Sequence, residues 1–108
     1  MNYQGMALEN QIKVKVKTTL GITKDTITLD VIDVLTDNGK MYQLDALEKE
    51  FTDNKSMLSA NSEKRLTRMF KNIHTLSQNL SRWDKMDENE QFEYVKVFTS
   101  VRVYLLQK

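Results

Sequence analysis

The side chains best suited to catalysis are few in this 108-residue sequence. There is no cysteine, which excludes disulfides, zinc–thiolate sites and thiol nucleophiles. The one histidine, His74, has Ser77 and Ser81 as possible nucleophilic neighbours on the same segment. No strained G-x-S-x-G turn presents either serine for attack. We therefore predict that His74 is a surface or boundary residue and that the protein is not an enzyme.

The sequence also predicts no metal site and no cofactor. Residues 34–45 are similar to a calcium-binding loop in having Gly39 at the sixth position. Val34, however, stands where such a loop needs its first carboxylate. Gly39-Lys40 lacks the upstream glycine of a phosphate-binding loop, and the chain has only three glycines. These patterns favour a binding function over a catalytic one.

Basic residues form one candidate binding surface. Four of them lie close together in the second half of the chain, with helical spacing: Lys64, Arg65, Arg68 and Lys71. A second basic row alternates with apolar residues near the N-terminus: Lys13, Lys15 and Lys17. Arrays of this kind bind phosphate backbones with an affinity that falls as salt rises. A nucleic-acid-binding accessory or regulatory protein is therefore the second function that the sequence suggests.

Acidic residues form the other candidate surface. The formal net charge is −6 over residues 25–53, between +3 over residues 1–24 and +5 over residues 54–86. The predicted protein-binding residues are Asp30, Asp33, Asp37, Asp45 and Glu48. Complementary fields would steer a basic partner, such as a nucleic-acid-binding protein, onto this surface. Small acidic inhibitors and adaptors of phages and plasmids act in this way, and we predict such an adaptor or inhibitor.

The elements that must position these side chains are predicted from periodicity. Residues 11–20 alternate β-branched side chains with lysines, as a half-buried strand does. Residues 26–36 are rich in β-branched side chains and lead into Asp37-Asn38-Gly39, a strong hairpin signal. Residues 39–44 would be the returning strand. The N-terminal half is thus predicted as a three-stranded antiparallel meander, followed by a short helix at 45–52.

Residues 26–36 also fit a helix. Its polar stripe would consist of Thr26, Asp30, Asp33 and Asp37, and Gly39 would be its C-terminal cap. This alternative fold is mostly α with a single N-terminal strand, and over residues 11–53 it resembles the ribbon–helix–helix DNA-binding proteins. The resemblance implies that the lysine-bearing strand would enter the major groove of DNA.

The C-terminal half is predicted as an antiparallel helical hairpin. A first helix spans about 62–84, with Asn61 or Ser62 as its cap. Its apolar residues recur at spacings of three and four, and they are Leu66, Met69, Ile73, Leu76, Leu80 and Trp83. A second helix, 88–106, begins at a capping box and carries Tyr94, Phe98, Val101 and Leu105. The short connection requires the helices to pack side by side.

A chain of this length is expected to form one domain. We predict a flexible N-terminal leader at residues 1–10 and a single α+β domain at 11–108. No apolar run approaches the roughly 18–20 residues of a transmembrane helix, and no secretory pattern opens the chain, so a cytoplasmic protein is expected. A three-stranded sheet covers only part of a hairpin about 30 Å long, which leaves a homodimer as an option.

Overall fold

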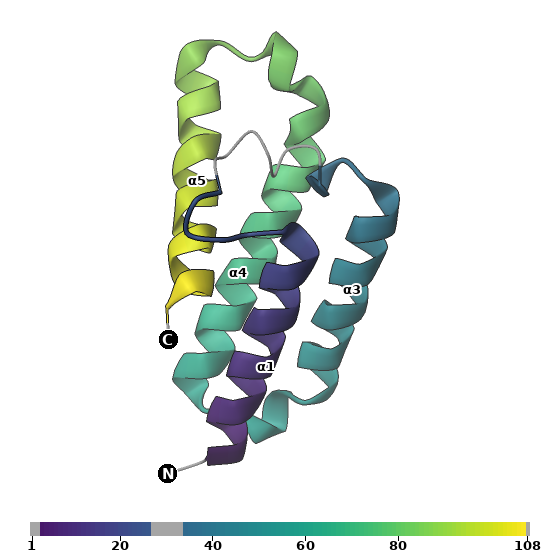
Figure 1. Ribbon diagram of the computed structural model, residues 1–108, viewed down its shortest axis with the longest axis vertical. Helices are drawn as coiled ribbons and strands as arrows, with labels where there is room; N and C mark the ends of the chain where they lie inside the picture. Colours follow the sequence, from purple (N-terminus) through teal and green to yellow (C-terminus); the bar gives the residue numbers. More distant parts are fainter. Residues whose placement is uncertain (1–2, 27–33, 108) are drawn as a thin grey trace.

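The computed structural model describes residues 3–26 and 34–107, and within these ranges the chain forms helices and no strand. The main helices are α1 (Tyr3–Leu20), α3 (Asn38–Asp53), α4 (Ala60–Asn79) and α5 (Glu88–Leu106) (Figure 1). Two short 3₁₀ helices, η1 (Lys55–Met57) and η2 (Leu80–Lys85), join the last three. The predicted α+β fold with its three-stranded meander is therefore wrong, and so is the alternative with one N-terminal strand.

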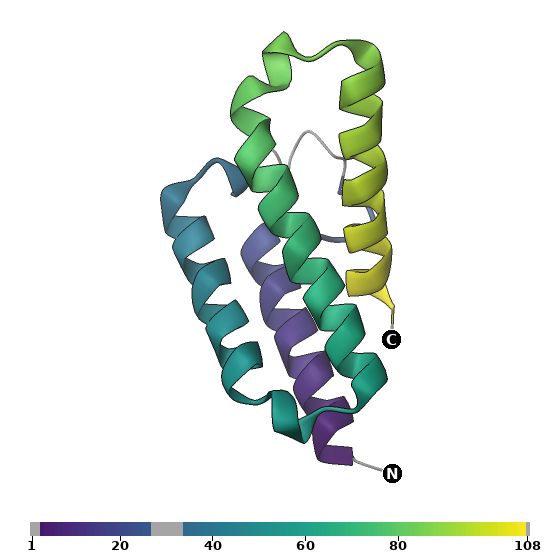
Figure 2. The ribbon, with the colours of Figure 1, turned by 180° about the vertical axis from the view of Figure 1, so that it is seen from behind.

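The helices form an elongated bundle of 46 × 24 × 22 Å in which successive long helices run in opposite directions. Helix α1 contacts α3, α4 and α5, and α4 also packs along α5. The view from behind shows α4 running obliquely between α3 and α5 (Figure 2). None of the helices that the structure describes is both long and apolar enough to cross a membrane.

Helix α1 replaces the first predicted strand. Leu8, Ile12, Val16 and Leu20 are spaced by four and are all buried, which defines the apolar stripe of a helix. Val14, which a strand would place beside Ile12 and Val16 in the core, is 53% exposed. Most of residues 1–10, predicted as a leader, belong to this helix as well, because α1 begins at Tyr3.

Gly21 ends α1 with the hydrogen-bond pattern of a Schellman cap. Its φ of +66° is in the left-handed region that glycine adopts without strain. The amide of Gly21 donates to the carbonyl of Thr18 at 3.1 Å, and the amide of Ile22 donates to that of Lys17 at 3.0 Å. Ile22 is buried directly after the turn, so the cap also fixes where the chain leaves the helix.

The predicted hairpin turn at Asp37-Asn38-Gly39 is instead the start of α3. The Asp37 carboxylate accepts a hydrogen bond from the backbone amide of Lys40 at 3.1 Å, as an N-cap does. The predicted returning strand at 39–44 and the short helix at 45–52 both lie within α3. The choice between strand and helix at 26–36 falls mainly on residues 27–33, which lie outside the described residues.

The predicted helical hairpin is present as α4, η2 and α5. Ser59, rather than Asn61 or Ser62, caps α4, and Asp87 caps α5 by accepting from the Glu90 amide at 2.8 Å. The predicted stripe residues Leu66, Met69, Ile73, Leu76 and Leu80 are buried, with Phe98, Val101 and Leu105 from α5. Trp83 and Tyr94 pack at the edge of this core. The two helices thus form the rigid frame for the polar residues described next.

Candidate functional site

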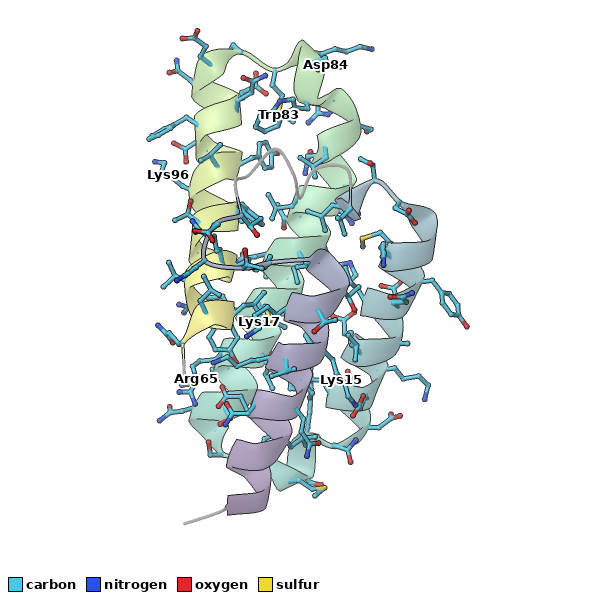
Figure 3. The ribbon with its side chains drawn as sticks, viewed as in Figure 1. Lys15, Lys17, Arg65, Trp83, Asp84 and Lys96 are labelled. Carbon is cyan, nitrogen blue, oxygen red and sulfur yellow. The ribbon has the colours of Figure 1, made fainter. Side chains whose placement is uncertain are left out.

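The three N-terminal lysines do not form the basic face that a strand would have given them. Successive residues of a helix turn by about 100°, so lysines two apart point in nearly opposite directions. Lys13 is buried, and its Nζ donates to the Gln107 carbonyl at 2.9 Å. Lys15 faces the other way and pairs with Glu50 of α3 at 3.2 Å (Figure 3). The surface predicted from Lys13, Lys15 and Lys17 is therefore divided between two sides of α1.

A buried carboxylate, Glu9 of α1, ties three helices together. Only 7% of Glu9 is exposed. Its Oε1 accepts from Ser62 Oγ and Arg65 Nη2, both at 2.9 Å, and its Oε2 accepts from Arg65 Nε at 2.9 Å and Tyr104 Oη at 2.8 Å. The hydrogen bonds from Arg65 outweigh burial and lower the pKa of Glu9 from 4.5 to about 2. Glu9 is thus ionised at neutral pH and neutralises Arg65.

Beside this network, α4 and α5 enclose a groove of about 480 Å³. From α4 it is lined by Asn61, Lys64, Arg65, Arg68, Met69 and Asn72. From α5 it is lined by Thr99, Ser100, Val101, Val103, Tyr104 and Gln107. The lining combines three cations, several neutral polar groups and an apolar floor, and it contains no carboxylate. We call it the cationic groove.

The charge of the cationic groove is carried mainly by Lys64 and Arg68. Both side chains are exposed, and neither makes an ion pair with any described residue, whereas Arg65 is paired with Glu9. Lys64, Arg68 and Lys71 also line a second, shallower hollow on the outer side of α4. The basic face that the sequence predicted on this helix is therefore continuous in space, and three of its four cations, Lys64, Arg68 and Lys71, have no ion-pair partner among the described residues.

The predicted acidic surface is only partly described. Asp37 is occupied as the cap of α3, and Asp30 and Asp33 lie outside the described residues. Asp45 and Glu48 face α4, where Glu48 Oε1 lies 2.8 Å from Nε2 of His74. His74 is half-buried, and its proximity to two carboxylates was not visible in the sequence, because His74 and Glu48 are 26 residues apart in the chain.

Sequence reasoning found the cations of this site and missed everything that shapes it. The α5 side of the groove and the anchoring carboxylate Glu9 were not among the predicted residues. The only local indication that Glu9 is buried was its helical position, next to Leu8 and one turn before Ile12 of the apolar stripe. Searches against protein-family models, curated proteins and solved structures give no match, so the function is argued from geometry.

Proposed function

We propose that the protein is a small binding protein that holds an acidic amphipathic helix of a partner protein in the cationic groove. The observation that carries the proposal is the pair of uncompensated cations, Lys64 and Arg68, above an apolar floor in a groove without carboxylates. Glutamates or aspartates of the partner would pair with these cations while its apolar side chains cover Val103, the exposed apolar residue of the lining.

The shape of the groove favours a helix as the occupant. An amphipathic helix binds by laying its apolar face between two others. The lining of α4 runs from Asn61 to Asn72, which corresponds to about 16 Å of helix axis and about three turns of a bound helix. The side chains of Asn61, Asn72 and Ser100 make no hydrogen bond within the described part of the chain, so they are available to orient the partner.

A nucleic acid is less well suited to this site. Useful affinity for a phosphate backbone takes about six to ten contacts, and the groove offers Lys64, Arg68 and, beyond its edge, Lys71. The Lys13 ammonium lies over one face of the Tyr104 ring, and the Tyr104 hydroxyl is bonded to Glu9, so the aromatic residue of the groove is already engaged within the fold. The Lys13 and Lys15 contacts on which that alternative depended are internal.

In this proposal the docking site is the cationic groove and not the acidic surface that the sequence predicted. Asp45 and Glu48 converge on His74, and Asp37 is a helix cap, so these carboxylates are partly used within the chain. We also propose a cytoplasmic location, which the absence of cysteine supports. No catalytic step forms part of the proposed function.

The test compares two double charge reversals. Lys64→Glu/Arg68→Glu removes the groove cations, whereas Lys40→Glu/Lys85→Glu makes the same charge change on α3 and η2, at residues that do not line the groove. The probes are a labelled three-turn peptide helix with a glutamate stripe and a leucine stripe, and the same peptide with lysines in place of the glutamates. Fluorescence anisotropy measures both.

We expect the acidic peptide to bind in preference to the basic one, and the groove reversal to weaken it at least about tenfold, because it loses two pairings and gains two repulsions. The control reversal should change binding by less than about threefold. Equal binding of both peptides, or equal loss in the two variants, would refute the proposal. A concentration-dependent dimer that only the groove reversal abolishes would instead assign the groove to a second copy of the chain.

A further inference from the structure

A separate polar cluster lies between α3 and α4, away from the cationic groove. Asp45 and Glu48 are three residues apart on α3 and therefore share a face of that helix. His74 of α4 lies opposite them, and one ligand atom from each of the three residues falls within 4.8 Å of the others. The shortest separation is 2.8 Å, between Glu48 Oε1 and His74 Nε2.

No lysine or arginine in the described part of the chain pairs with either carboxylate. Among the described residues, the carboxylate of Asp45 makes no hydrogen bond or ion pair, and the only ion-pair partner of Glu48 is His74. The lysine next to Glu48 in the sequence, Lys49, pairs instead with Asp53 at 2.9 Å. Two anionic groups and one imidazole thus face a shared point from two rigid helices, which is how ligands of a metal ion are held.

We propose that Asp45, Glu48 and His74 bind a divalent transition-metal ion, and that Zn²⁺ fits them best. One nitrogen and two carboxylate oxygens, completed by water, match the three protein ligands of an open zinc site. Ca²⁺ needs six to eight oxygens, and the absence of cysteine removes the ligands that soft metals prefer. Imidazole favours Zn²⁺ over Mg²⁺.

The distances allow this site with small side-chain movements. Ligand bonds of about 2.0–2.1 Å in a tetrahedral arrangement place ligand atoms about 3.3 Å apart. The Glu48–His74 contact at 2.8 Å must therefore open slightly, and the other two separations, which lie within 4.8 Å, must close by at most about 1.5 Å. Asp45 is exposed and bonded to no other described side chain, so rotation about its side-chain bonds can supply the closure.

Metal binding here would link α3 more firmly to α4. The described contacts between these helices otherwise centre on the rings of Phe51 and Phe70, which stack with centroids 5.7 Å apart. A ligand that binds only the folded chain stabilises it in proportion to its concentration over Kd. Zn²⁺ should therefore raise the thermal unfolding temperature, and the rise should depend on all three ligands.

The experiment titrates the tag-free protein with ZnCl₂ in an isothermal calorimeter and repeats the thermal unfolding scan with and without Zn²⁺. We expect one Zn²⁺ per chain, not displaced by excess Mg²⁺. Asp45→Asn and His74→Gln should each weaken Kd at least about tenfold, because even loss of a residue that only orients a ligand costs about 10–100-fold. The matched control is Asp53→Asn, an exposed carboxylate on the same helix, which should leave Kd unchanged.

Two results would overturn the site: no saturable Zn²⁺ binding, or binding that survives unchanged in Asp45→Asn and His74→Gln. Asp45 makes no other described contact, so its variant should keep the fold, which circular dichroism checks. The groove reversal Lys64→Glu/Arg68→Glu should bind Zn²⁺ like the unmodified chain. The zinc site and the partner-binding groove are therefore tested independently.

Discussion

The buried carboxylate Glu9 provides the sharpest test of how this fold is held together. Replacing it by glutamine keeps the size of the side chain and removes the charge that faces Arg65. Glutamine offers one acceptor oxygen where the carboxylate has two, so at least one donor among Ser62, Arg65 and Tyr104 loses its partner. We expect Glu9→Gln to destabilise the bundle markedly at neutral pH.

The size of the effect follows from the pKa of Glu9. Folding lowers the pKa of Glu9 from 4.5 to about 2, and each pKa unit corresponds to about 1.4 kcal/mol. The ionised carboxylate therefore stabilises the fold by at most about 3 kcal/mol. Arg65 is 48% exposed, and solvent screening of its charge reduces the expected loss to about 2 kcal/mol. The stabilisation belongs to ionised Glu9, whose pKa is lowered by folding. It is therefore complete above about pH 5 and is lost as the pH falls toward 2.

Urea denaturation followed by Trp83 fluorescence measures this loss. The free energy of unfolding of Glu9→Gln should lie about 2 kcal/mol below that of the unmodified chain at pH 7, and the gap should shrink between pH 5 and pH 3. The control is Glu50→Gln, which removes an exposed pair with Lys15 and should cost less than about 1 kcal/mol. Equal losses in the two variants, or a Glu9→Gln deficit that stays constant with pH, would refute this reasoning.

Substitutions at two further positions, Tyr104 and Gly21, test other features of the fold by the same denaturation assay. Tyr104→Phe removes one donor from Glu9, so we expect a loss of about 1 kcal/mol and an upward shift of the pKa of Glu9, measurable by carboxyl NMR titration; an unchanged pKa would contradict the hydrogen bond. Gly21→Ala should cost about 1–2 kcal/mol from backbone strain alone, because no atom crowds the added Cβ. Gly21→Asn should cost less, since asparagine tolerates φ above zero, and equal costs would point away from the left-handed cap.

The first helix of the C-terminal hairpin could be predicted because its apolar spacing has a single interpretation. Alternating steps of three and four from Leu66 to Trp83 match a helix and no strand. Asp87 with Glu90 also has one structural meaning, and the predicted cap is present. Where the local pattern was specific, the expected element and its buried face are both found.

The N-terminal half was misread because its patterns fit two structures. Ile12, Val14 and Val16 alternate like a strand, yet Leu8, Ile12, Val16 and Leu20 also repeat every four residues. The second pattern begins at Leu8, before the segment with the strand-like alternation, and the burial of Leu8 and exposure of Val14 decide for the helix. Asp37-Asn38-Gly39 is ambiguous in the same way, because the residues that favour a hairpin turn also favour a helix N-terminus.

The site was harder to predict than the fold because its contacts are distant along the chain. Tyr104 donates to a carboxylate 95 residues away, and Arg65 to the same group 56 residues away. Periodicity reports which face of a helix is apolar and not which helix covers it. The basic row on α4 could therefore be found, whereas its pairing with α5 and the meeting of His74 with Glu48 required the structure.

Mutations on α4 can separate stability from binding, because Arg65 is used within the fold whereas Lys64 and Arg68 are not. Arg65 forms an ion pair with Glu9. Replacing Arg65 would leave this buried carboxylate unpaired and would destabilise the groove itself. Lys64 and Arg68 do not stabilise the fold in this way, because neither forms an ion pair with a described residue. Charge reversal at these two positions should therefore weaken recognition of an acidic helix at least about tenfold while leaving the free energy of unfolding within about 0.5 kcal/mol of that of the unmodified chain. If the reversal instead destabilised the bundle as much as Glu9→Gln does, the groove cations would belong to the architecture, and the surface for partner binding would have to lie elsewhere.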